Sequence, residues 1–202
     1  MKRVVASAVV LLMWALTATA KEYQSSFGFI ASIPDDWLVL TKQAIRDNPA
    51  LADSPDPGGA SIESSALKDL IARVEHGSIE FFYDRTTSDA TFSDNINVRL
   101  GGPGKIPSAP EDVKAECTAY AQALARAVGR TLAVATCETR TVGAGRAFYV
   151  EYEGRVAGTV TMQYQLLRPD SKMLFVTATC KRATLDKFRS DFEAIVKSIK
   201  FS

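Results

Sequence analysis

Residues 159–167, Thr-Val-Thr-Met-Gln-Tyr-Gln-Leu-Leu, alternate between polar and apolar side chains from Thr159 to Leu166. A β-strand points successive side chains to opposite faces of a sheet. The apolar set on one face is Val160, Met162, Tyr164 and Leu166, and the polar set on the other is Thr159, Thr161, Gln163 and Gln165. One covered face and one wetter face are typical of an antiparallel sheet.

The same period of two continues on both sides of this stretch. It predicts strands at 131–142, 145–153, 158–168 and 172–181. Gly-containing or Pro-Asp turns separate these strands, and such short turns join antiparallel neighbours. The second half of the chain therefore predicts an antiparallel meander.

Apolar residues at helical spacing flank the meander. One helix ends at Gly77 and has its apolar residues at positions 67, 70, 71 and 74. A second helix starts at a capping box, Ser108 to Glu111, and ends at Gly129. The closing helix covers 184–200. Helices packed on the faces of a mainly antiparallel β-sheet make an α+β fold, in contrast to a doubly wound parallel sheet.

The first half of the chain predicts shorter elements. Residues 27–33 and 37–40 form a hairpin around a Pro-Asp-Asp turn, and strands follow at 79–85 and 95–100, before a Gly/Pro-rich break at 101–107. Residues 48–60 are rich in Pro and Gly and predict a mobile surface loop. No linker divides residues 21–202, so we expect a single domain.

The first twenty residues have the form of a secretory signal. Lys2 and Arg3 precede a short apolar run, and Ala18-Thr19-Ala20 ends it. The run is too short to cross a bilayer comfortably. We expect cleavage near Ala20 and a periplasmic or secreted location. The residue directly after Ala20 is not a cysteine that could carry a lipid anchor, so we expect no membrane insertion after signal removal.

The charge balance excludes some partners. Without residues 1–20 the chain has 22 basic and 23 acidic side chains, a net charge of −1. Nucleic acids and anionic membranes attract clustered Lys and Arg, so the balance argues against both.

The order of segments resembles the PsbP-like superfamily. The resemblance rests on the segment from Phe27 to Trp37, on Phe-Ser-Asp-Asn-Ile-Asn-Val at 92–98, on Phe-Tyr-Val-Glu-Tyr at 148–152, and on the closing helix with Ser-Ile-Lys-Phe at 198–201. That superfamily consists of α/β/α sandwiches, among them photosystem II extrinsic subunits and bacterial secreted proteins. The resemblance implies a binding or accessory role more than catalysis. The metal-binding histidines of some photosystem members have no counterpart here.

The sequence is poor in catalytic groups. His76 is the only histidine, and it falls at a predicted helix end, where a cation meets the negative pole of the helix. Residues 99–106 lack the first Gly and the Ser/Thr of a phosphate loop, and residues 142–148 lack the third Gly of a dinucleotide fingerprint. We therefore expect no catalytic residue, no metal and no cofactor.

Glu151 and Glu153 share one face of a predicted strand with Tyr149. Paired carboxylates can hydrolyse glycosides or bind calcium, which keeps a hydrolase as a third hypothesis. The simpler interpretation is a solvated sheet face near the Thr and Gln residues of the next strand. Tyr149, Glu151, Glu153 and Gln163 are then candidates for a partner surface.

The three cysteines predict one disulfide. Cys117 lies about 18 Å back along the helix that ends at Gly129. Cys137 lies about 20 Å along the strand that starts at Thr131. The two are therefore level, and we expect a Cys117–Cys137 bond. Cys180 remains unpaired, either packed in the core or serving as a reactive or intermolecular thiol.

Two hypotheses lead for the function. The first is a non-catalytic exported domain that binds an unknown protein partner, which predicts an exposed patch of Tyr, Phe or Met. The second is a carrier for a small ligand or lipid, which predicts a large apolar pocket between sheet and helices.

Overall fold

The computed structural model describes residues 20–53, 64–87 and 92–202. The helices within these ranges are α1 (Lys42–Asp47), α2 (Ala50–Asp53), α3 (Ser64–His76), α4 (Pro110–Val128) and α5 (Leu185–Ser198), with a 3-10 turn at Arg182–Thr184. The strands are β1 (Ala20–Gln24), β2 (Phe29–Pro34), β3 (Trp37–Leu40), β4 (Glu80–Asp84), β5 (Asn95–Pro103), β6 (Val134–Val142), β7 (Gly145–Glu153), β8 (Thr159–Leu167), β9 (Lys172–Lys181) and β10 (Lys200–Phe201).

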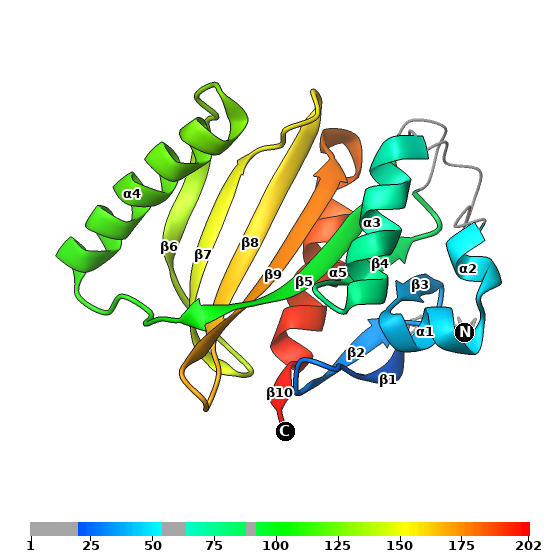
Figure 1. The fold of residues 1–202 in the computed structure, drawn as a ribbon. Coiled ribbons are helices and arrows are strands. Elements are labelled where there is room, and N and C mark those ends of the chain that lie inside the picture. Colours follow the sequence, from blue (N-terminus) through cyan, green and yellow to red (C-terminus); the bar gives the residue numbers. More distant parts are fainter. Residues whose placement is uncertain (1–19, 54–63, 88–91) are drawn as a thin grey trace, which may run out of the picture.

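The strands form two antiparallel sheets (Figure 1). The larger sheet has the order β3-β4-β5-β9-β8-β7-β6, and the smaller one has the order β1-β2-β10. Strands β6 to β9 pair with their sequence neighbours and make the predicted meander. The predicted α+β class, with a mainly antiparallel sheet, is therefore confirmed.

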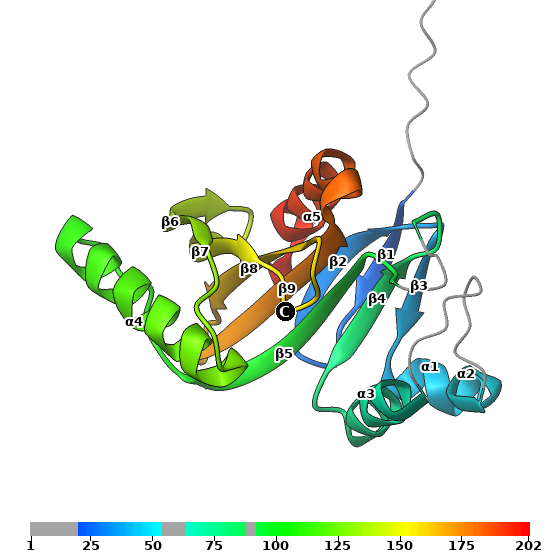
Figure 2. The same ribbon diagram turned by 90° about the horizontal axis from the view of Figure 1, so that it is seen from above.

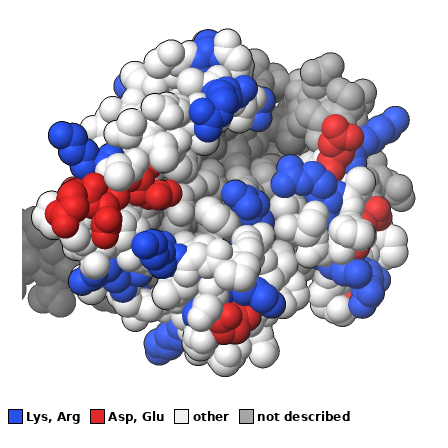
Figure 3. All heavy atoms as spheres, turned by 60° about the vertical axis from the view of Figure 1, so that its left-hand side comes forward, with Lys and Arg blue, Asp and Glu red and all other residues white. Residues whose placement is uncertain are grey.

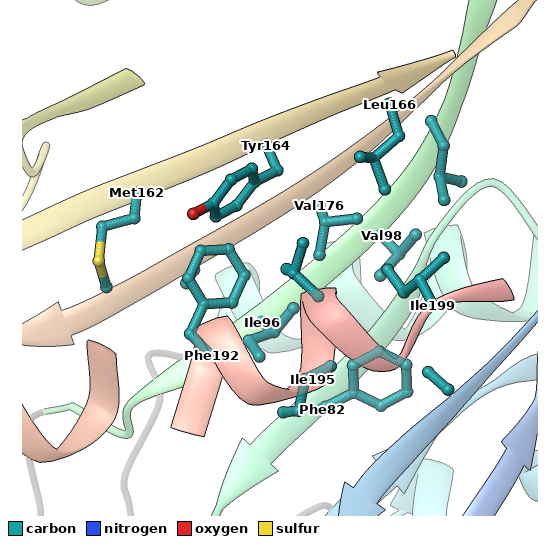
Figure 4. Close-up of a cluster of buried hydrophobic side chains, with 14 of the residues drawn as sticks. Phe82, Ile96, Val98, Met162, Tyr164, Leu166, Val176, Phe192, Ile195 and Ile199 are labelled. Atoms are coloured by element: carbon teal, nitrogen blue, oxygen red, sulfur yellow. The ribbon is translucent and has the colours of Figure 1, made fainter. Parts of the chain in front are cut away.

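The main hydrophobic core lies on one face of the larger sheet. Helix α5 and the smaller sheet cover this face (Figure 2). Phe192 of α5 points toward Tyr164 in the apolar row of β8, and Met162 and Tyr164 of that row are at most 2% exposed (Figure 4). The alternation at 159–167 thus places its apolar residues under α5, because burying that face removes the most apolar area from water.

The opposite face of the larger sheet carries α3 near one end and α4 near the other (Figures 1 and 2). Ile71 and Val74 of α3 pack with Leu40 and Tyr83 of the end strands. Helix α4 packs its apolar stripe on Phe148, Val150 and Tyr152 of β7. The central strands β5, β9 and β8 lie between these two helices.

The predicted hairpin of 27–33 with 37–40 is wrong. β2 pairs with β1 and β10 in the smaller sheet, and β3 pairs with β4 in the larger one. The turn at Asp35 and Asp36 is present, but the chain changes sheets there. It does so because Phe29 and Ile33 of β2 pack into the core that α5 closes, while β3 finds its backbone partner in β4.

The predicted capping box and the predicted break after residue 100 also need correction. Helix α4 begins as expected near Pro110 and ends at Gly129, but its N-cap is Ala109, without a side-chain cap, so the capping box is wrong. β5 continues through the predicted break to Pro103. The glycine at position 101 permits this continuation, because a Cβ atom there would lie only 2.3 Å from the Phe175 ring.

The predicted mobile loop at 48–60 contains the short helix α2, preceded by α1, and its remainder from 54 lies outside the described residues. The predicted signal segment also lies outside them, except for Ala20, which begins β1. In the part of the chain that the structure describes, no helix combines the length and the apolar character needed to cross a bilayer.

Candidate functional site

The structure places Tyr149 and Glu151 beneath α5, on the covered face of β7. The side chain of Glu151 accepts hydrogen bonds from Nη1 and Nη2 of Arg189 on α5, the latter at 2.9 Å. The Tyr149 hydroxyl donates to the same carboxylate at 2.8 Å. Arg140 of β6 lies 3.6 Å from the centroid of the Tyr149 ring. These hydrogen bonds and ring contacts link α5 to the sheet.

This arrangement does not suit a hydrolase. Burial acts to raise the pKa of Glu151, but the hydrogen bonds from Arg189 and Tyr149 outweigh it and hold the pKa below its usual range. A glycosidase acid needs the opposite shift, because it must keep its proton near neutral pH. Glu153 lies near Arg130, 3.5 Å from its guanidinium. Both carboxylates thus have cationic partners within the chain.

The structure buries three of the four residues that were expected on a partner surface. Tyr149, Glu151 and Gln163 are buried, with at most 7% of their surface exposed. Gln163 lies on the opposite sheet face and accepts a hydrogen bond from Tyr120 of α4. The predicted neighbours are also wrong: Tyr149 and Glu151 pair with Tyr164 and Met162 of the apolar row of β8, and not with its Thr and Gln residues. The helices that cover the two faces come from distant parts of the chain. Glu153 alone of the four keeps partial exposure.

The predicted disulfide between Cys117 and Cys137 is present, with Cα atoms 5.8 Å apart. It joins α4 to the edge strand β6. Cys180 is unpaired and fully buried on the α5 face, which matches the packing interpretation. Burial raises the pKa of its thiol to about 12, so the thiol stays protonated and unreactive.

A groove with a polar floor lies on the sheet face between α3 and α4. Alternation on β5, β9 and β8 turns the apolar side chains to α5 and the following side chains toward this face: Asn95, Asn97, Arg99, Phe175, Thr177, Thr179, Thr161, Gln163 and Gln165. Figure 1 looks onto this face, where β5, β9 and β8 run between α4 and α3. We call this surface the α3–α4 groove.

Side-chain hydrogen bonds across β8 and β9 order the groove floor. Gln163 donates to the Thr177 hydroxyl at 2.8 Å, and Gln165 donates to Gln163 at 3.2 Å. The hydroxyls of Thr161 and Thr179 are 3.3 Å apart. Such cross-strand polar pairs stabilise a sheet face that water reaches. They leave a floor of amide and hydroxyl groups with few alternative rotamers.

Arg99 of β5 lies on the same sheet face as the floor of the α3–α4 groove. Its guanidinium stacks over the Phe175 ring, with its carbon 4.0 Å from the ring centroid. Burial lowers the pKa of Arg99, and the positive charge of Arg73 on α3 acts in the same direction. The guanidinium nevertheless stays charged, because the pKa of Arg is so far above neutrality. The groove therefore holds a partly desolvated positive charge.

One end of the groove deepens into a pocket of about 300 Å³. Its lining includes Asn95, Asn97, Tyr152 and Phe92, with Arg155 and the exposed Val156 at its edge. Figure 3 shows the molecule turned from Figure 1, with a hollow near the centre of the view and Lys or Arg side chains beside it. The largest group of acidic side chains lies at the left of the view, and further acidic side chains lie to the right of the hollow and below it.

A second concavity, of about 500 Å³, lies between α1 and the turn before β2. Its buried carboxylate, Glu80, accepts hydrogen bonds from the Ser25 hydroxyl and from the amide and hydroxyl of Ser26. These contacts anchor the turn that joins β1 to β2. We interpret Glu80 as structural, because the chain itself supplies its hydrogen-bond donors. Among the described residues no group of three His, Cys, Asp or Glu side chains is placed to hold a metal ion.

Sequence reasoning singled out only Gln163 of the groove residues. Asn95, Asn97 and Arg99 alternate with Ile96 and Val98, so their shared face was visible in the sequence. The sequence did not show that β5 pairs with β9, which follows it by 69 or more residues. This pairing aligns Arg99 with Phe175.

No protein-family model and no curated protein matches the sequence. Among solved structures, the fold is similar to cyanobacterial PsbP (CyanoP) from Synechocystis sp. PCC 6803, with 13% identity, a TM-score of 0.55 and 98% of both chains covered. It is also similar to the Ran-binding protein Mog1p of Saccharomyces cerevisiae, with 8% identity, a TM-score of 0.51, and 92% of this chain and 96% of that one covered. The PsbP-like fold predicted from the sequence is confirmed.

Proposed function

We propose that the protein is an exported, non-catalytic accessory domain that binds a protein partner in the α3–α4 groove. One observation carries this proposal: between α3 and α4 the sheet has an ordered polar face on which Asn95, Asn97, Thr177 and Thr179 keep partial exposure and line a pocket of about 300 Å³. A fold that closes one side of its sheet with α5 and leaves the other side open offers a surface for a partner. The partly exposed Phe175 and Phe92 supply aromatic contact area there.

The space beneath α5 favours a protein partner over an enclosed lipid. Met162, Tyr164 and Phe192 fill the interior between sheet and helix, each with at most 2% exposure (Figure 4). A carrier would need an apolar cavity at this place. The α3–α4 groove, in contrast, is open and polar, which suits a surface contact.

Export is the second part of the proposal. The signal-like residues 1–20 and the Cys117–Cys137 disulfide both fit an oxidising compartment. We expect N-terminal sequencing of the protein recovered from its host to begin at or near Lys21. Recovery of a chain that still begins at Met1, from the reducing cytosol, would contradict export.

Site-specific photo-crosslinking tests the groove. A photoreactive amino acid replaces Asn97 on the groove floor, and a matched variant carries it at Ala115, which is exposed on the outer side of α4. We expect the Asn97 position to capture one protein from the host envelope and the Ala115 position to miss it. Equal capture at both positions, or a stoichiometric small molecule in native mass spectra without a protein adduct, would overturn the proposal.

A further inference from the structure

We propose that the α3–α4 groove takes an acidic, extended segment of its protein partner, with a carboxylate of that segment bound at Arg99. This inference rests on the proposed function and specifies the partner's chemistry. It starts from three arginines along the groove: Arg73 on α3, Arg99 on β5 and Arg155 after β7.

In residues 20–53, 64–87 and 92–202, none of the ion pairs involves Arg73, Arg99 or Arg155. Arg155 is the one charged side chain among those that line the 300 Å³ pocket. None of these three guanidinium groups is therefore neutralised by an ion pair within the described part of the chain.

Arginines on the covered face behave differently. Arg189 pairs with Glu151, and Arg140 reaches both Glu138, at 2.7 Å, and Glu193, at 3.4 Å. The chain thus neutralises its arginines where α5 meets the sheet and leaves those of the open face unpaired. An unpaired, partly buried guanidinium gains more from an incoming carboxylate than an exposed one, because part of its hydration is already lost.

The position of Arg99 suits a carboxylate. Stacking on Phe175 restrains the guanidinium and leaves its N–H groups at the edge of the plane, where a carboxylate can accept two hydrogen bonds. Arg73 adds a second positive charge from α3, within range of Arg99. Amides and hydroxyls of the floor, Asn97 and Thr177 among them, can exchange hydrogen bonds with the peptide groups of an extended segment.

Fluorescence anisotropy with labelled octaglutamate tests the inference on the full mature chain. The variant Arg99→Gln removes the central charge, and Arg146→Gln is the matched control. Arg146 is exposed at the start of β7 and forms no ion pair among the described residues. Both variants change the net charge equally. We expect Arg99→Gln to weaken octaglutamate binding by about tenfold, as loss of one charge-assisted pair does, and Arg146→Gln to leave it unchanged.

Additional probes and variants test whether the binding depends on charge and on the geometry of Arg99. Octaglutamine should not bind, and raising NaCl from about 50 to 300 mM should weaken octaglutamate binding, because salt screens ionic contacts. Arg99→Lys should give an intermediate affinity, because it keeps the charge but loses the paired N–H geometry. Thermal unfolding of each variant separates loss of binding from loss of fold.

Several results would overturn the inference. These are the absence of octaglutamate binding by the folded wild type, equal losses in Arg99→Gln and Arg146→Gln, or tighter Arg99-dependent binding of labelled polygalacturonate, which would point to an acidic polysaccharide. If photo-crosslinking from Asn97 captures a protein and Arg99→Gln does not reduce that capture, the acidic segment is wrong and the proposed function stands. If Asn97 captures no protein, the proposed function itself fails.

Discussion

At the scale of single residues, Glu151 shows how one carboxylate can be held charged in a mostly apolar layer. It lies beneath α5 near the core that Tyr149, Tyr164 and Phe192 help to form. An ionised group in such a place is costly unless charged or polar neighbours satisfy it. Arg189 and Tyr149 do so, and the residue thereby attaches α5 to β7.

This contact predicts a dependence of stability on pH. The pKa of Glu151 is lower in the folded protein than its ordinary value of 4.5. Its contribution is therefore present above that value and is lost as the pH falls through the lower folded pKa. We expect urea unfolding between about pH 5 and pH 3 to show a steeper loss of stability in the wild type than in Glu151→Gln.

A matched variant isolates this effect from general acid denaturation. Glu116 is exposed on α4 and forms no ion pair among the described residues, so Glu116→Gln should keep the pH dependence of the wild type. If Glu151→Gln and Glu116→Gln change the slope equally, Glu151 is not the responsible group.

At the scale of elements, α4 is attached differently from α5. None of the α4 side chains is fully buried, whereas α5 buries Phe188, Phe192, Ile195 and Val196. The disulfide from Cys117 to β6 supplies a covalent attachment, and the Tyr120 hydroxyl adds a hydrogen bond to Gln163. Because α4 is one wall of the α3–α4 groove, its attachment also sets the shape of that groove.

Removing the disulfide should therefore affect α4 first. The bond closes a loop with a sequence separation of 20, and the chain-entropy model assigns about 3 kcal/mol to such a crosslink. We expect the double variant Cys117→Ser, Cys137→Ser to lose about that free energy of unfolding in urea. Amide hydrogen exchange should rise in α4 and stay slow in α5.

The buried Cys180 provides the control for this experiment. Cys180→Ala leaves the disulfide intact, so its α4 amides should exchange at the wild-type rate. Unchanged α4 exchange in the double variant would show that apolar packing alone holds the helix.

At the scale of the whole molecule, one core connects both sheets. Side chains of β2, in the smaller sheet, and of β5, β8 and β9, in the larger one, meet α5 in a single buried cluster. Trp37 of β3 belongs to this cluster and stacks on Phe188 of α5, with ring centroids 5.5 Å apart. This shared core supports the proposal that residues 21–202 form a single domain.

A single core predicts a single unfolding transition. Trp37 is the only tryptophan after residue 20, so its fluorescence reports on the junction of β3 with α5. Far-UV circular dichroism follows the meander and the helices together. We expect both signals to change with the same urea midpoint. Two separated midpoints would show that the smaller elements unfold independently of the meander.

Local patterns in the sequence were enough to predict the meander, the long helices and the disulfide. Side-chain alternation and turn residues act over a few positions. The pattern at residues 159–167 therefore predicted both the strand and its two faces. Cys117 and Cys137 could be paired because both distances were counted from one turn. In each case the governing interactions are close in sequence.

The contacts between helices and strands became visible only in the tertiary structure. The transfer of β2 to a second sheet, the burial of Glu151 under α5 and the pairing of β5 with β9 join segments far apart in the chain. Hydrophobic burial is non-directional, so an apolar face shows that a residue will be covered and not by what. The α3–α4 groove exists for the same reason: it is the part of the sheet that distant helices leave open.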